Sequence, residues 1–232
     1  MKAAVITFPA SNCDRDAITT LQKYNDKVDN IWHKETNLDN GYDLIILPGG
    51  FSFGDYLRTG SIARFSPIMD EVIKFANNGG KVLGICNGFQ ILCESGLLPG
   101  VLLRNKNQKF YCENQTIKVA NDSSAYTHLL KKDDVLNIPV AHADGCYFCD
   151  DSTLGDLKAN NQILFQYSDK AGTLTDDANF NGSVANIAGV MNKEGNVFGM
   201  MPHPERASEP QLGNTDGLRM LEGLISQAQG AN

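Results

Sequence analysis

One cysteine stands where an apolar run gives way to a helical pattern. Residues 81–85 (Lys-Val-Leu-Gly-Ile) lead directly into Cys86-Asn-Gly-Phe-Gln. A nucleophile at such a strand-to-helix turn needs neighbours without side chains, which Gly84 and Gly88 provide. The N-terminus of the following helix would favour a thiolate, and the amide N–H of Asn87 would face an oxyanion formed beside the sulfur. The pattern predicts a cysteine nucleophile.

A histidine and a glutamate follow a later apolar run, in the segment Met-Pro-His203-Pro-Glu205-Arg. An imidazole can take a proton from a thiol and return it near neutral pH. A carboxylate two residues away could fix its tautomer, and the flanking prolines would stiffen the loop. From spacing alone, Cys86 could instead be a buried structural cysteine and His203 part of a surface loop. Taken together, the three residues predict a nucleophile, its base and an orienting acid.

A glycine pair follows another apolar run, residues 43–47, at the strand end where ligands collect in α/β sheets. Glycines there let backbone N–H groups approach a ligand, so Gly49, Gly50 and Phe51 could complete an oxyanion hole. A phosphate-binding P-loop would need Lys and then Ser or Thr after its last glycine. Here Asp55 takes that place, which disfavours a phosphate site.

The elements that must position these residues alternate along the first half of the chain. Apolar runs at 2–7, 43–47 and 81–85 predict buried parallel strands, and helical spacing lies between them at 17–24 and 68–76. This alternation predicts an α/β fold with a mostly parallel central sheet and helices on both faces, flavodoxin-like, in one domain over residues 1–232. The second half contributes a final helix near 216–228 and further strands, expected at 101–103, 116–119, 136–141, 162–167, 187–191 and 196–200.

Composition excludes several classes of protein. The chain has 232 residues, 42% of them hydrophobic and 20% charged, as in ordinary globular proteins. A net charge of −7 argues against a nucleic-acid surface, which needs a basic stripe. No secretory signal or apolar run of about 20 residues is visible, so we expect no membrane partner and a cytoplasmic location. The six cysteines are then expected to be reduced thiols.

The remaining cysteines and histidines give weaker signals. Cys146-Tyr-Phe-Cys149 has the spacing of half a zinc knuckle, with His142 nearby, but no second close pair completes it. We therefore expect no metal in this chain. Two further groups are expected to carry no chemistry: core or incidental cysteines at Cys13, Cys93 and Cys112, and surface histidines at His33 and His128.

The three motifs occur in an order that resembles the class I, triad-type glutamine amidotransferases. The longer segments Gly-Gly-Phe-Ser-Phe-Gly-Asp-Tyr-Leu-Arg and His-Pro-Glu-Arg, with residues 179–189, resemble the glutaminase subunits of phosphoribosylformylglycinamidine synthase, an enzyme of purine biosynthesis. The resemblance covers nearly the whole chain. It departs at His142-Ala-Asp144-Gly145, where the family is expected to read His-Gly-Glu-Gly, so the role of the shorter acid is left open.

The resemblance implies a reaction and partners. Cys86 would attack the side-chain amide of glutamine, His203 would shuttle protons and Glu205 would orient His203. Gln90 and the backbone of residues 49–51 would hold the glutamine and its oxyanion. A large synthetase subunit, with a small third subunit, would receive the ammonia; this chain would need no cofactor, and ATP and magnesium would belong to the synthetase. The alternative is a cysteine hydrolase on a similar scaffold, such as a peptidase or a γ-glutamyl hydrolase.

Overall fold

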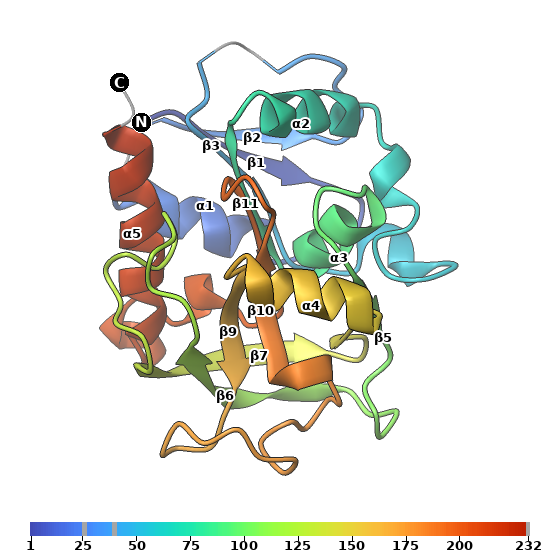
Figure 1. Cartoon of the computed structure of the whole chain (residues 1–232). Helices are drawn as coiled ribbons and strands as arrows, with labels where there is room; N and C mark the ends of the chain where they lie inside the picture. The colour runs from blue at the N-terminus through green and yellow to red at the C-terminus, as the bar shows by residue number, and fades with distance from the viewer. Residues whose placement is uncertain (25–26, 39–40, 231–232) are drawn as a thin grey trace.

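Within the part of the chain that the structure describes, a sheet of nine strands runs through the molecule (Figure 1). The structure is a computed structural model that describes residues 1–24, 27–38 and 41–230. Five neighbouring strands are parallel: β2 (Val28–Trp32), β1 (Ala3–Thr7), β3 (Leu44–Leu47), β4 (Lys81–Ile85) and β11 (Val197–Met200). An antiparallel extension continues through β10 (Ile187–Met191), β9 (Ile163–Tyr167), β6 (Tyr111–Val119) and β7 (Val135–His142). A separate pair joins β5 (Val101–Leu103) to β8 (Cys146–Phe148).

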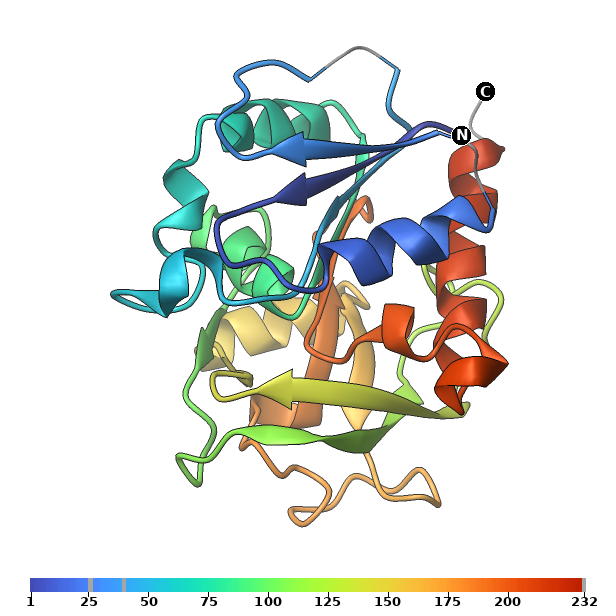
Figure 2. The same cartoon turned by 180° about the vertical axis from the view of Figure 1, so that it is seen from behind.

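Helices cover both faces of the parallel strands. On one face lie α2 (Ile68–Asn77) and α3 (Asn87–Glu94), and on the other α1 (Asp14–Gln22) and α5 (Asp216–Gln229), as Figures 1 and 2 show from opposite sides. The inner strand β3 is apolar throughout because both of its faces are covered, and all four of its residues are buried. The predicted α/β class is therefore confirmed. No helix among the described residues is long and apolar enough to cross a membrane.

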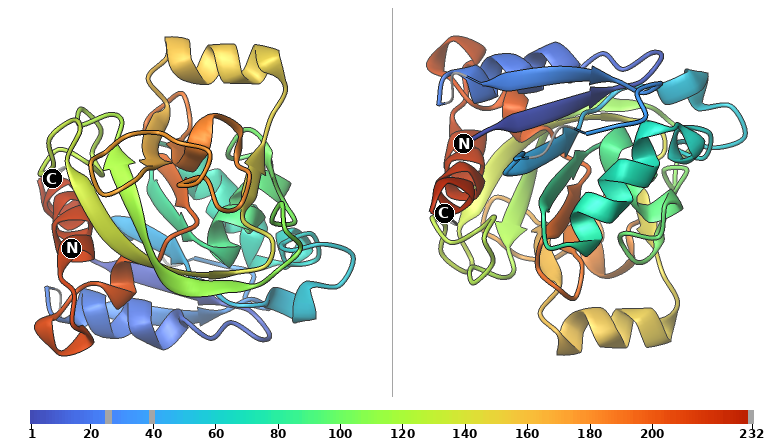
Figure 3. Two further views of the ribbon diagram at one scale, coloured as in Figure 1. Left: turned by 90° about the horizontal axis from the view of Figure 1, so that it is seen from below. Right: turned by 90° about the horizontal axis from the view of Figure 1, so that it is seen from above.

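The sequence prediction missed strands β2 and β8 and helix α4. Strand β2 lies at the edge of the sheet and alternates between half-buried and exposed residues, so no continuous apolar run marks it. Helix α4 (Asp151–Ala159) lies at the periphery (Figure 3) and buries only Leu157, which leaves almost no apolar face to recognise. Strand β6 begins at Tyr111, five residues before the predicted start at 116. The prediction missed these first residues because most of them are exposed and form no apolar pattern.

His33 was expected at the surface, and that prediction is wrong. Its side chain is buried, with Nδ1 3.1 Å from Oγ of Ser66. The imidazole packs edge-on against the rings of Trp32 and Phe53, at centroid distances of 4.6 and 5.2 Å. The sequence around His33 does not reveal its burial, because Phe53 and Ser66, which help to cover the ring, come from another part of the chain.

Candidate active site

The topology brings Cys86 and His203 to the same edge of the sheet. Strands β4 and β11 are parallel neighbours, with Ile85 opposite Met200. Cys86 follows the first strand directly and His203 follows the second after two residues. The carboxyl ends of parallel strands lie at the same edge of a sheet. Cys86 and His203 therefore reach the same edge although more than a hundred residues separate them in the sequence.

Cys86 occupies a strained turn. Its backbone has φ 51° and ψ −104°, a region that residues with a side chain rarely adopt, and the strain costs on the order of 1–3 kcal/mol. The amide N–H of Cys86 donates to the carbonyl of Met200 at 2.7 Å, and its Sγ lies 3.8 Å from the carbonyl oxygen of Ala141. A Cβ at Gly88 would overlap the carbonyl of Leu47, and one at Gly84 would lie 2.6 Å from the carbonyl carbon of Gly88. The predicted need for glycine at both positions is confirmed.

His203 and Glu205 form a buried pair. Nδ1 of His203 lies 2.6 Å from Oε1 of Glu205, and the two side chains are each 1% exposed. The amide N–H of His203 donates to the carbonyl of Pro139, which fixes the loop against strand β7. Among the described residues, Nε2 of His203 and Oε2 of Glu205 have no hydrogen-bond partner. Nε2 therefore remains available to exchange a proton with a thiol.

The charge of Glu205 controls the protonation of His203. Burial by itself lowers the pKa of this imidazole, but Glu205 and the thiols of Cys86 and Cys13 raise it, and the net pKa lies well above its usual value. An imidazole in this state holds the proton that it takes from a thiol. The geometry thus suits a thiol nucleophile with an oriented base.

The glycine-rich loop is fixed beside Cys86 by side chains of helix α3. Oδ1 of Asn87 accepts from the amide N–H of Ser52 at 3.1 Å, and Nδ2 of Asn87 donates to Oε1 of Gln90. The amide N–H of Phe51, a predicted oxyanion donor, instead donates to the carbonyl of Ala10 at 3.0 Å. Its N–H is thus already occupied, and the donors that the prediction leaves for an oxyanion are the amides of Gly49, Gly50 and Asn87.

A small cavity of about 20 Å³ lies beside the thiol. Its wall opposite helix α3 is the segment 141–144, held by a hydrogen bond of 2.6 Å from Nε2 of Gln90 to the carbonyl of Asp144. Gln90 therefore braces the cavity wall as well as lining it. The residues around the cavity are Gly50, Phe51, Asp55, Thr59, Cys86, Gln90, Ala141, His142, Ala143 and Asp144. A larger hollow of about 420 Å³ beside α4 is lined by no cysteine or histidine, and we do not place the site there.

His142 and Asp144, where the family resemblance departs, both belong to this wall. Burial, and then the nearby His203, lower the pKa of His142 to about 3, so its imidazole is neutral. Its Nδ1 lies 3.1 Å from Oδ1 of Asn105, whose Nδ2 donates to the carbonyl of His142. The carboxylate of Asp144 lies 3.5 Å from Arg104. The shorter acid thus forms an ion pair at the rim, while its carbonyl meets Gln90.

Asp55 makes stability depend on pH. Burial, and then the charge of Asp144, raise the pKa of Asp55 from 3.8 to about 6. The folded state therefore binds a proton that the unfolded state releases, and stability falls as pH rises from about 4 to about 6. Asp55→Asn should be more stable than the parent above that interval and equal to it below. The full shift corresponds to about 3 kcal/mol, and partial exposure reduces our expectation to about 1 kcal/mol.

Urea unfolding at about pH 7 and about pH 4 would measure this difference. Asp177→Asn, the same change on an exposed turn, is the matched control. An Asp55→Asn variant less stable than the parent near neutral pH would contradict the prediction, because the carboxylate would then be making a favourable contact.

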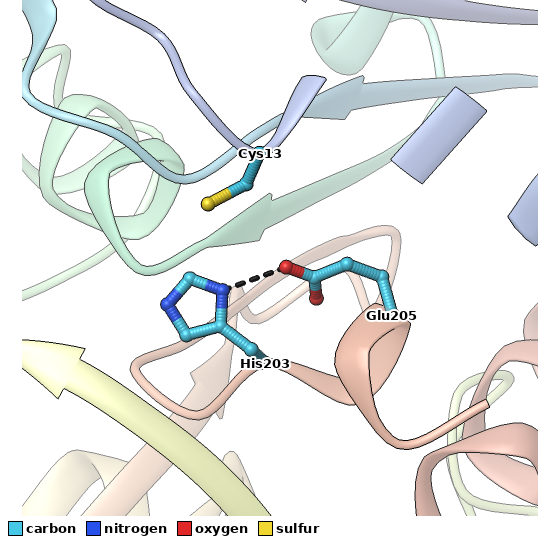
Figure 4. Close-up of side chains that lie close together, drawn as sticks. All are labelled: Cys13, His203 and Glu205. Carbon is cyan, nitrogen blue, oxygen red and sulfur yellow. Dashed lines mark hydrogen bonds and ion pairs between the residues drawn. The ribbon is translucent and has the colours of Figure 1, made fainter. Parts of the chain in front are cut away.

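Cys13 is the residue that the sequence prediction missed. It was expected to be a core or incidental cysteine without a role in the chemistry; it does belong to the core, but it lies beside the imidazole of His203 (Figure 4). Burial raises the pKa of this thiol, and His203 acts in the opposite direction. A signal did exist, because Cys13 follows β1 at the same carboxyl edge of the sheet as Cys86. The other four cysteines lie elsewhere: Cys93 on α3, an exposed Cys112, and Cys146 and Cys149 around β8.

A cysteine at a strained turn, with a histidine–glutamate pair presented by the neighbouring parallel strand, defines the arrangement of a triad-type cysteine nucleophile on an α/β fold. Residues 1–217 match the family model described as the CobB/CobQ-like glutamine amidotransferase domain. The chain belongs to this glutamine amidotransferase family, as the sequence motifs predicted.

Relatives of the chain match along nearly its full length. A protein of Chlorobaculum parvum named phosphoribosylformylglycinamidine synthase subunit PurQ is 53% identical over 99% of this chain and 91% of its own. A protein of the same name from Koribacter versatilis is 53% identical over 97% of both chains. A chain of the structure titled PurLQS from Thermotoga maritima is 40% identical, with a TM-score of 0.83 over 97% of both chains. Another Thermotoga maritima glutamine amidotransferase, 15% identical over 100% of this chain and 99% of its own with a TM-score of 0.61, shares the fold alone.

Proposed function

We propose that this chain is the glutaminase subunit of a phosphoribosylformylglycinamidine synthase. It hydrolyses glutamine to glutamate and ammonia and passes the ammonia to an ATP-dependent synthetase subunit. The observation that carries the proposal is the meeting of Cys86 with the His203–Glu205 pair beside a small cavity. Support for the particular synthase comes from the relatives of that name, which are about half identical over nearly the full chain.

The first half-reaction forms a thioester. The sulfur of Cys86 attacks the side-chain amide carbon of glutamine, while His203 holds the proton released by the thiol. Backbone N–H groups of Gly49, Gly50 and Asn87 stabilise the oxyanion that develops on the amide oxygen. As the C–N bond breaks, His203 returns the proton to the leaving nitrogen, and ammonia departs.

The second half-reaction releases glutamate. Water attacks the γ-glutamyl thioester, His203 takes its proton, and the C–S bond breaks to restore the thiol of Cys86. Glu205 keeps Nδ1 of the ring engaged throughout, so that Nε2 performs both proton transfers. The wall at 141–144, braced by Gln90, closes one side of the cavity.

The partner is the large synthetase subunit, joined by a small third subunit. The solved relative whose structure is titled PurLQS supports this assembly. We assign ATP and magnesium to the synthetase, and no cofactor to this chain, which acts as one glutamine amidotransferase domain in the cytoplasm. A free-standing peptidase or γ-glutamyl hydrolase is not favoured, because the likeness to the synthase subunits spans 97–99% of the chain.

A glutamine-like chloroketone tests the site directly. We expect it to alkylate Cys86 and no other cysteine, because only this thiol lines the cavity. Glutamine should slow the alkylation, whereas asparagine, one methylene shorter, should protect poorly. Peptide mass spectrometry after digestion gives the modified residue and its rate.

The comparison variant is Cys112→Ser, which removes an exposed thiol and should leave the labelling unchanged. Alkylation of Cys13 or Cys146 instead of Cys86 would overturn the assignment of the nucleophile. Alkylation of Cys86 without protection by glutamine would overturn the assignment of the substrate.

A further inference from the structure

The proposed reaction assigns no role to the buried thiol of Cys13, which lies next to the base His203. Cys13 is 2% exposed, and its Sγ, a nitrogen of His203 and a carboxylate oxygen of Glu205 all lie within 4.8 Å of one another. We call these three residues the Cys13 cluster. Figure 4 shows the sulfur pointing toward the edge of the imidazole that carries Nδ1, the nitrogen bonded to Glu205. Thiol, imidazole and carboxylate therefore converge on one point in the interior.

The space at that point depends on a missing side chain. A Cβ at Gly49 would lie 3.1 Å from Sγ of Cys13 and 2.7 Å from Cε1 of His203, so only glycine leaves the sulfur and the ring open to each other. The carboxylate of Glu205 is 1% exposed and contacts the ring of His203 through Oε1, while its Oε2 has no hydrogen-bond partner among the described residues. A buried carboxylate with so few partners is costly, and a cation bound to it would offset its charge.

The donor set matches the preferences of zinc. Zn²⁺ binds cysteine sulfur at about 2.3 Å, histidine nitrogen at about 2.0–2.1 Å and carboxylate oxygen at about 2.0–2.2 Å, in tetrahedral geometry. Such distances separate neighbouring ligand atoms by roughly 3.4–3.6 Å. To reach these distances, the two ligand atoms that lie farthest apart, at no more than 4.8 Å, must move closer together. The 2.6 Å distance between Nδ1 and Oε1 must lengthen by less than an ångström. Hard cations such as Mg²⁺ prefer oxygen ligands and suit this set poorly.

We propose that Cys13, His203 and Glu205 form an inhibitory zinc site. Zn²⁺ takes the place of the proton between Nδ1 of His203 and Oε1 of Glu205, and Sγ of Cys13 is the third protein ligand. The thiol of Cys13 releases its proton to solvent, the single ring proton of the neutral imidazole moves from Nδ1 to Nε2, and water occupies the fourth position. The ligand atoms already lie within 4.8 Å of one another, so side-chain shifts of about 1–1.5 Å bring them to zinc distances.

Zinc on Nδ1 disables the base by fixing its tautomer. The remaining ring proton then sits on Nε2, which has no lone pair left to accept the proton of Cys86. Glutamine hydrolysis stops while the nucleophile itself stays free of metal. The inhibition rests on the proposed function, but the metal site does not, since it needs no reaction at Cys86.

Cobalt is the probe, because Co²⁺ occupies zinc sites and thiolate coordination gives it a charge-transfer absorption in the near ultraviolet. The metal-free full chain should develop this absorption with one equivalent of Co²⁺ and lose it when Zn²⁺ is added. Cys86→Ala should keep the absorption and Cys13→Ser should lose it. Cys13→Ser should weaken zinc affinity, measured against a chromophoric chelator, by more than the roughly 10- to 100-fold that changes outside the coordination shell cost.

Cys112→Ser is the matched control and should retain both the absorption and the zinc affinity of the parent. Absence of the absorption in the parent, its survival in Cys13→Ser, or its loss in Cys86→Ala would each overturn the proposal; the last result would assign the metal to the nucleophile. If Cys13→Ser does not fold, the absorption of Cys86→Ala still shows whether the metal-bound thiolate belongs to Cys86. Failure of the metal site would leave glutamine hydrolysis unaffected, and failure of the proposed function would leave the cobalt absorption unaffected.

Discussion

Cys86→Ala is expected to abolish glutamine-dependent synthesis by the assembled complex while synthesis from ammonium salts continues. Without the sulfur no thioester forms, and His203 and Glu205 have no nucleophile to serve. We expect the glutamine-dependent rate to fall by at least about 10⁴-fold, as when the nucleophile of other triads is removed. Free ammonia bypasses this chain, so the ammonium-dependent rate should stay within about twofold of the parent. Product formation with each nitrogen source measures both rates on one preparation.

Cys112→Ser, a change of the same element at an exposed position, should alter neither rate. Loss of both activities in Cys86→Ala would indicate a disrupted complex, which a pull-down with the synthetase would reveal. Glutamine-dependent synthesis at the parental rate in a complex that still forms would contradict the nucleophilic role of Cys86.

The features that could be predicted from the sequence are those that depend on residues adjacent in the chain, such as a tight turn or a buried strand. The turn at Cys86 was recognisable because a nucleophile held at positive φ requires small residues on both sides, and the structure shows that Gly84 and Gly88 have no room for a Cβ. The parallel strands β3 and β4 were recognisable for a similar reason. A strand covered on both faces must be apolar at every position, and the pattern is visible without the fold.

What depends on contacts between distant segments could not be predicted this way. Cys13 reaches His203 only because its backbone N–H bonds to the carbonyl of Gly49, and that bond joins segments following two different strands. The same two loops pair where the amide N–H of Phe51 donates to the carbonyl of Ala10, so this N–H is not available to an oxyanion. Strand β2 and helix α4 bury too little to be marked by periodicity, so only the assembled sheet reveals them.

His203→Gln is expected to lower kcat for glutamine hydrolysis by about 10³- to 10⁴-fold, with KM changed much less. The glutamine amide can donate to Oε1 of Glu205, so the carboxylate keeps a partner in the interior. Removing the ring without such a donor would leave a buried charge unpaired and cost about 3–5 kcal/mol of stability. An amide cannot hold a proton from Cys86 or return it to the leaving ammonia, so both half-reactions lose their proton carrier.

His128→Gln is the control, since His128 lies outside the site, with Nδ1 near the carbonyl of Ala125 and Nε2 near Oγ of Ser226. Steady-state glutamate release gives kcat and KM, and thermal unfolding checks that both variants are folded. If His203→Gln raised KM and left kcat unchanged, His203 would bind the substrate rather than carry the proton.

The pH profile of kcat distinguishes these two roles further. Because Glu205 raises the pKa of His203, the profile of the parent should show a limb above the usual histidine range, and the variant should lack it. A variant that kept this limb would assign it to another group, and the pair His203–Glu205 would then orient the loop instead of moving the proton.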